Sequence, residues 1–132
     1  MELISLIKDQ SYVRLQDVIY WYVQLLRNRL SREDTWQWLT SNWDWIEQKF
    51  KNDKSYDDFP SVTGMILGTD EWLKKYIEFF EPMNSNIALS RAIELGIKDI
   101  DSRAKWRERD LTAVREFLMS VSEEERLTVP KP

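Results

Sequence analysis

The side chains that could do acid–base chemistry in this sequence are carboxylates, because the chain contains no histidine and no cysteine. Two carboxylates placed together can act as general acid and general base in hydrolysis. Neighbouring acids occur at Asp57–Asp58, Asp70–Glu71 and Asp99/Asp101. The first two pairs fall in predicted first turns of helices, where the helix dipole stabilises acids, and periodicity directs the third pair outward. A hydrolase built on these carboxylates is therefore the weakest functional hypothesis.

The absence of His and Cys also weighs against metal and nucleophile chemistry. Structural zinc sites are nearly always built from these two residue types, and His is the usual partner of a nucleophilic Ser or Cys. The sequence has neither a phosphate-binding glycine loop nor a nucleophile elbow. We therefore expect no catalytic residue, no metal ligand and no cofactor within this segment.

Arginines are the remaining candidates for a binding site. Arg27 and Arg29 lie with Arg32 at a turn between two predicted helices, where cations also suit a helix end. Arg91 lies among apolar residues near the start of a long predicted helix, so its guanidinium needs a partner such as a carboxylate. We take Arg27, Arg29 and Arg91 as candidate contacts to a peptide or to a neighbouring domain.

A second basic group brackets Trp106 and consists of Arg103, Lys105, Arg107 and Arg109. It could bind an anion or a peptide carboxylate. Because acids at positions 101, 108 and 110 are interleaved with it, a solvated surface of mixed charge is the favoured interpretation.

Helices must position all of these side chains. The clearest helix is predicted over residues 32–51, with Ser31 as its N-cap. Its apolar residues recur at spacings of three and four, which draws one stripe along the helix. This stripe consists of Trp36, Leu39, Trp43, Ile46 and Phe50. Trp38 and Trp45 share a second face, which predicts a helix packed between two neighbours.

Further helices are predicted over residues 15–29, 56–67, 70–81, 87–106 and 110–119. The helix over 87–106 has its own stripe, formed by Leu89, Ile93, Ile97, Ile100 and Ala104. Only 3 Gly and 4 Pro occur in 132 residues, which favours helices joined by short connections. The sequence thus predicts an all-α fold of about six or seven helices, arranged as stacked antiparallel hairpins in a HEAT- or armadillo-like superhelical array. The 7 Trp are best explained as packing between helical layers rather than as a ligand platform.

Composition also limits the partners and the domain organisation. The formal net charge of −4 weighs against nucleic acid, and no apolar run reaches the length of a membrane span. With no Cys and no signal-peptide pattern, we expect a cytoplasmic protein. The uncapped apolar start, Met1 to Lys8, favours a fragment of a longer chain. We expect one helical domain over residues 1–122 and a flexible, charged tail over residues 123–132.

Several segments, in their order, resemble the C-terminal helical domain of the aminopeptidase N family, which includes puromycin-sensitive and endoplasmic-reticulum aminopeptidases. The resemblance covers about residues 3–119. The segments are Arg27-Asn28, Trp36-Gln37-Trp38-Leu39, Asn42-Trp43-Asp44-Trp45-Ile46, Phe79-Phe80, Arg91 with Ile97, Ile100 and Trp106, and Arg109-Asp110 with Val114 and Leu118.

The resemblance implies that the chemistry lies upstream, in a thermolysin-like domain with an H-E-x-x-H zinc site and a G-x-M-E-N motif, neither of which occurs here. It implies that this segment forms part of a bowl of helices that covers the active site and helps to enclose a peptide substrate. Zinc would then belong to the catalytic domain of the same parent chain, and that domain and the peptide would be the partners. The alternative is a free-standing helical-repeat module that binds another protein.

Overall fold

The part of the chain that the structure describes is entirely helical. The computed structural model describes residues 6–128, with side chains as far as Glu123. The elements are η1 (Leu15–Asp17), α2 (Val18–Arg27), α3 (Arg32–Ser41), α4 (Trp43–Phe50), α5 (Asp58–Ile66), α6 (Asp70–Phe80), η2 (Glu81–Met83) and α7 (Ile87–Thr128). The predicted all-α fold of about six or seven helices is confirmed, since residues 6–128 contain no strand. None of these helices combines the length and the apolar character of a membrane span.

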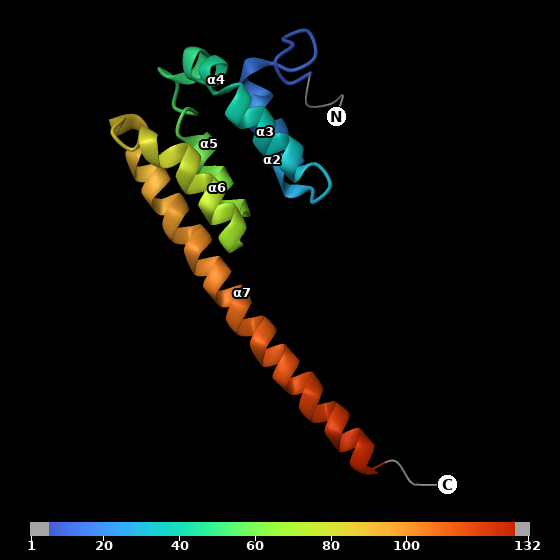
Figure 1. Ribbon diagram of the computed structural model, residues 1–132. Helices are drawn as coiled ribbons and strands as arrows, with labels where there is room; N and C mark the ends of the chain where they lie inside the picture. Colours follow the sequence, from blue (N-terminus) through green and yellow to red (C-terminus); the bar gives the residue numbers. More distant parts are fainter. Residues whose placement is uncertain (1–5, 129–132) are drawn as a thin grey trace.

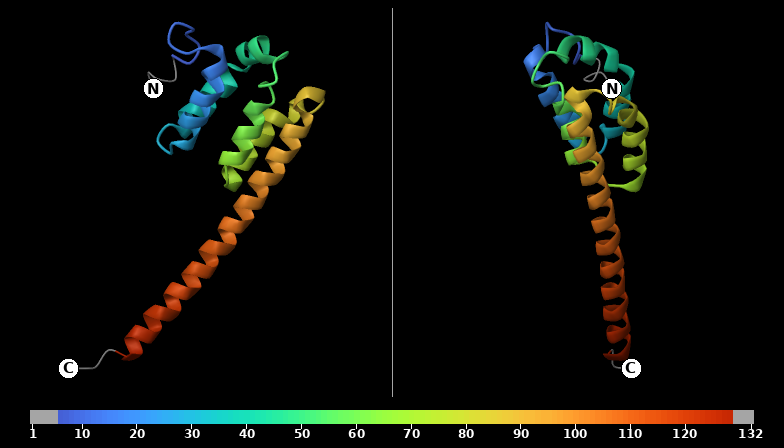
Figure 2. Two further views of the ribbon diagram at one scale, coloured as in Figure 1. Left: turned by 180° about the vertical axis from the view of Figure 1, so that it is seen from behind. Right: turned by 90° about the vertical axis from the view of Figure 1, so that its left-hand side faces the viewer.

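The helices form a folded body from which one long helix projects. α2 and α3 form an antiparallel hairpin, and α4 crosses the end of that hairpin (Figure 1). α5, α6 and α7 run alternately down, up and down beside it, and α5 lies between α2 and α7. Both views in Figure 2 show that α7 continues far beyond the other helices. The body therefore contains the core, and the second half of α7 has no neighbouring helix within residues 6–128.

The helix predicted over residues 32–51 is two helices, and this prediction was wrong. The chain leaves helical geometry at Asn42, whose φ and ψ are −115° and 17°. The Asn42 side chain donates from Nδ2 to the Trp38 carbonyl at 2.8 Å and accepts from Lys8 Nζ at 2.9 Å. An Asn amide that binds nearby backbone competes with the helical hydrogen bonds, which explains the break.

The apolar stripe survives the break, because all five of its residues are buried. Trp36 meets Trp72, Phe79 and Phe80 edge-on at centroid distances of 5.7–6.0 Å. These contacts join α3 to α6 and confirm that the stripe packs between helical layers. The predicted second face is also present, since the rings of Trp38 and Trp45 lie 6.4 Å apart.

α7 is one continuous helix, although the sequence predicts two over residues 87–106 and 110–119. The charged stretch between them contains neither Gly nor Pro, so nothing in it interrupts helical hydrogen bonding. Leu89, Ile93 and Ile100 of the predicted stripe are fully buried. The backbone stays helical through Thr128, while residues 129–132 lie outside the described part. The division into a domain of residues 1–122 and a tail of residues 123–132 stays a prediction.

Two glycines allow α5 and α7 to cross at close range. A Cβ atom on Gly64 would lie 2.5 Å from the Cα atom of Gly96, and a Cβ atom on Gly96 would lie 2.0 Å from the Tyr76 hydroxyl. The Tyr76 hydroxyl donates to the Pro60 carbonyl at 2.9 Å, so it is held in this place. The crossing fixes the direction in which α7 leaves the body.

Candidate functional site

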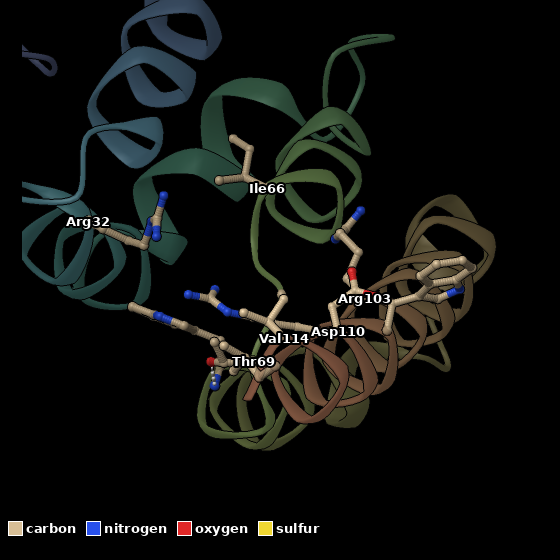
Figure 3. Close-up of a pocket in the computed structure, with 11 residues that line it drawn as sticks. Arg32, Ile66, Thr69, Arg103, Asp110 and Val114 are labelled. Atoms are coloured by element: carbon tan, nitrogen blue, oxygen red, sulfur yellow. Dashed lines mark hydrogen bonds between the residues drawn. The ribbon is translucent and has the colours of Figure 1, made fainter. Parts of the chain in front are cut away.

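A cavity of about 550 Å³ lies where α7 leaves the helical body. We call it the α7 cavity; it is lined by Arg32, Ile66, Gly68, Thr69, Trp72, Arg103, Trp106, Arg107, Asp110, Leu111 and Val114. Figure 3 shows Arg32 on one side of the cavity and Arg103 and Asp110 of α7 on the other. Its wall combines two indole rings and aliphatic side chains with three guanidinium groups and one carboxylate. Such a wall suits a peptide-like ligand that has both apolar and anionic groups.

The turn between α5 and α6 forms one wall of the α7 cavity. Thr69 caps α6, because its hydroxyl accepts from the Trp72 backbone N–H at 3.3 Å. Arg103 of α7 donates from Nε to the Leu67 carbonyl at 2.9 Å, which ties α7 to the end of α5. The Nη2 atom of Arg103 is buried and has no hydrogen-bond partner among the described residues. A buried unpaired donor is costly, but this atom has almost no exposed surface, so a ligand in the cavity does not reach it.

Arg32 and Ser31 close the C-terminal end of α2. Arg32 donates from Nε to the Leu26 carbonyl at 2.9 Å and from Nη2 to the Arg27 carbonyl at 3.1 Å. This geometry agrees with the predicted suitability of a cation at a helix end. Ser31 occupies the predicted N-cap position of α3, but its side chain makes no cap hydrogen bond. Its hydroxyl donates instead to the Leu25 carbonyl at 2.6 Å, because the tight turn places the end of α2 within its reach.

The candidate contact residues do not form one site. Arg27 ends α2 and Arg29 lies in the turn after it, and both are exposed. Arg91 lies in the first turns of α7, at a different end of the body from this turn (Figure 1). Arg91 is exposed rather than surrounded by apolar residues, because the buried residues of α7 near it, Leu89 and Ile93, lie on the other side of the helix. Their role as contacts to a peptide or a domain stays a prediction.

The basic group around Trp106 is divided between two faces of α7. Arg103 and Arg107 line the α7 cavity together with Trp106, whereas Lys105 and Arg109 do not. Lys105 pairs with Asp101 at 2.8 Å on the exposed surface. Sequence reasoning missed the cavity because half of its wall comes from the α5–α6 turn. The spacing of four between Arg103 and Arg107 was the available signal, since it places both on one helix face.

The carboxylate pairs show no arrangement for hydrolysis. Asp58 lies in the first turn of α5, and burial, followed by the Asp57 and Asp53 carboxylates, raises its pKa. Asp70 and Glu71 lie exposed in the first turn of α6, as predicted. No group of three or more metal-ligating side chains occurs in the described part of the chain. Within residues 6–123, whose side chains are described, nothing therefore fits a zinc ion, which the family resemblance assigns to a catalytic domain outside this segment.

The sequence of this chain is similar to part of several known aminopeptidases. Residues 1–102 match the model of a family described as ERAP1-like C-terminal domain. The chain is 38% identical over 112 residues to an aminopeptidase N of Lactococcus lactis, with 85% of this chain and 13% of the relative covered. It is 33% identical over 109 residues to the aminopeptidase N of Lactobacillus helveticus, with 83% and 13% covered. Rat endoplasmic reticulum aminopeptidase 1 is 24% identical over 126 residues, with 88% and 13% covered.

The chain thus spans only about an eighth of the length of these relatives. The family match extends to residue 102, where α7 is still packed on the body, and relatives match over as many as 126 residues. Both the family match and the helical architecture agree with the resemblance seen in the tryptophan segments. This chain belongs to the ERAP1-like C-terminal domain family and is part of the C-terminal helical domain of aminopeptidase N-like proteins.

Proposed function

We propose that this segment is a non-catalytic part of a zinc-dependent aminopeptidase, in which it covers the active site and helps to enclose the peptide substrate. The observation that carries the proposal is the family match over residues 1–102, together with the small share of each aminopeptidase relative that the chain spans. The catalytic domain of the same parent chain would supply zinc and the reacting groups. A cytoplasmic location for the parent stays a prediction.

Three features suit the segment to a covering role. Its aromatic core makes it a stiff body, which can close over a site without donating a reacting group. A closed cover would exclude water and hold the substrate in place. The α7 cavity offers indole rings and guanidinium groups to a peptide, and Arg27, Arg29 and Arg91 are further candidate contacts to the peptide or to the catalytic domain.

The parent chain provides the test. We expect the reading frame that contains this sequence to encode an H-E-x-x-H motif upstream of Met1, and the full-length protein to release N-terminal residues from peptides until zinc is chelated. The isolated 132-residue chain should show no peptidase activity with or without zinc. Turnover by the isolated chain would contradict the proposal. A reading frame that begins at Met1 would favour the free-standing helical module.

The covering role can be tested separately in the full-length protein. Deletion from the full-length protein of the segment that corresponds to this 132-residue chain should change KM and kcat for long peptides much more than for an aminoacyl chromogenic substrate. The reason is that only a peptide extends beyond the reacting bond. As a control, the deleted protein should keep its zinc content. Equal losses on both substrates with zinc retained would argue against enclosure of the peptide.

A further inference from the structure

The packed face of α7 continues in the same register into the half that projects from the body, with one charged residue, Arg107, where the helix leaves the body. Ile93, Ile97, Ile100 and Ala104 face α5 and α6 at alternating spacings of four, three and four residues. That spacing keeps apolar residues on one side of a helix, where a second helix can lie along them. We call this face the α7 seam. Within the body it is a helix-packing surface.

Beyond the body the same spacing continues through Arg107 to Leu111, Val114 and Leu118. These three aliphatic side chains are 51%, 53% and 59% exposed. Phe117, beside the seam, is 66% exposed. Single exposed apolar residues are ordinary, but several that lie in the register of a buried helix face mark an interaction surface.

We propose that the exposed part of the α7 seam is a docking surface for an amphipathic helix from the part of the parent chain that precedes this segment. The inference rests on the proposed function. Its occupant is an aliphatic helix face, because the exposed seam repeats the chemistry and spacing with which α7 already packs on α5 and α6. The parent supplies it, because the matched part is only 13% of an aminopeptidase relative, and the other 87% of such a chain lies outside this segment.

The α7 cavity gives the docking surface a basic end. Arg32, Arg103 and Arg107 line it with a single carboxylate, Asp110. Carboxylates and the C-terminal carbonyls of a helix both pair well with guanidinium groups. The part of the docked helix that lies beside the cavity should therefore carry an acidic side chain, while the cavity itself remains available to a peptide.

Hydrogen exchange in the full-length parent and in the isolated chain tests the inference. In the parent, the amides of residues 107–121 should be protected, and the double variant Leu111→Glu/Leu118→Glu should lower that protection about 100-fold or more, since each buried Leu contributes roughly a tenfold change or more. The control is Thr112→Glu/Ser120→Glu, which adds the same charge at two exposed positions off the seam and should leave protection unchanged. In the isolated chain these amides should exchange freely.

Each outcome separates the two proposals. A parent that is an active aminopeptidase but leaves residues 107–121 unprotected would overturn the docking surface alone. Protection by a second copy would appear as a dimer of the isolated chain that the Leu→Glu variant dissociates, and would also overturn it. A parent that protects these residues but has no aminopeptidase activity would overturn the proposed function and leave the docking surface supported.

Discussion

Trp43 brings together aromatic rings from several elements of the core. Its ring stacks on Tyr56 at 5.9 Å and meets Phe59, Phe79 and Phe80 edge-on at 5.5–6.4 Å. Aromatic pairs of this kind stabilise a core beyond the area that they bury. The ring thus joins α4 to α5 and α6 directly.

Replacing Trp43 by Ala should therefore cost about 3–5 kcal/mol of the free energy of unfolding. A loss of that size is a large fraction of the stability of a typical domain. Trp106→Ala is the matched control, because this ring is 65% exposed and its loss should change stability by roughly 0.5 kcal/mol or less. Urea denaturation followed by circular dichroism measures both. Similar midpoints for the two variants would contradict the packing account.

A buried hydroxyl pair gives a second prediction for single residues. The Tyr22 hydroxyl bonds with the Thr63 hydroxyl, which itself donates to the Phe59 carbonyl at 2.6 Å. Because the Thr63 hydroxyl donates its proton to the Phe59 carbonyl, the Tyr22 hydroxyl is the donor in this pair. Burial raises the pKa of the Tyr22 phenol. Thr63→Val should cost about 1–3 kcal/mol, because it leaves a buried donor without an acceptor.

Tyr22→Phe should cost less than Thr63→Val, because it removes the donor and leaves Thr63 its own bond to Phe59. The double variant should then be close to Tyr22→Phe alone. A double-mutant cycle from urea denaturation measures the coupling. Purely additive changes in the free energy of unfolding would show that the hydrogen bond between the two hydroxyl groups does not stabilise the fold.

Among the elements, the crossing of α5 and α7 is the most restrictive contact. Gly96→Ala should destabilise the chain by about 1–3 kcal/mol, because the new methyl group meets the fixed Tyr76 hydroxyl. Gly64→Ala should act in the same direction against the backbone of Gly96. Gly68→Ala is the control, since its Cβ atom would lie 3.4 Å from the nearest atom of Arg103. Thermal unfolding compares the three variants, and a stabilising Gly96→Ala would show that helix propensity outweighs the clash.

Element positions were largely predictable because the apolar residues recur at helical spacing. The stripe from Trp36 to Phe50 is buried as its period predicted, although the helix breaks at Asn42. An Asn is tolerated within a helix, so its preference for backbone contacts showed only in the folded chain. The helix that begins at Ile87 was predicted to end at residue 106, because the residues that follow have no apolar pattern, but it continues to Thr128. A polar stretch such as residues 107–110 lowers the apolar signal without interrupting the helix.

The candidate site was much less predictable, because it is a product of tertiary packing. Arg103 and Arg107 can be placed on one helix face from their spacing, but the turn at Gly68 and Thr69 that faces them comes from 34 or more positions earlier. The spacing of apolar residues along the sequence does not predict that this turn lies beside α7. Family resemblance supplied the functional context that spacing could not.

At the scale of the whole molecule, the two halves of α7 differ in the interactions that stabilise them. The first half is packed on α5 and α6, so tertiary contacts stabilise it. Residues 105–120 are all exposed, so that part of the helix depends on its own propensity within this chain. A helix without tertiary packing is marginal in water. The isolated chain should therefore lose the helicity of its projecting segment gradually, before the body unfolds cooperatively.

Truncation tests this division of stability. A chain that ends at Glu108 keeps the α7 seam under α5 and α6, so its cooperative melting transition should fall by only a few degrees. A chain that ends at Gly96 loses Ile97, the fully buried Ile100 and Ala104, and it should not fold cooperatively. Differential scanning calorimetry measures both transitions. If removal of residues 109–132 abolished folding of the isolated chain, the projecting segment would have to stabilise the body, and the exposed seam could not be reserved for a partner.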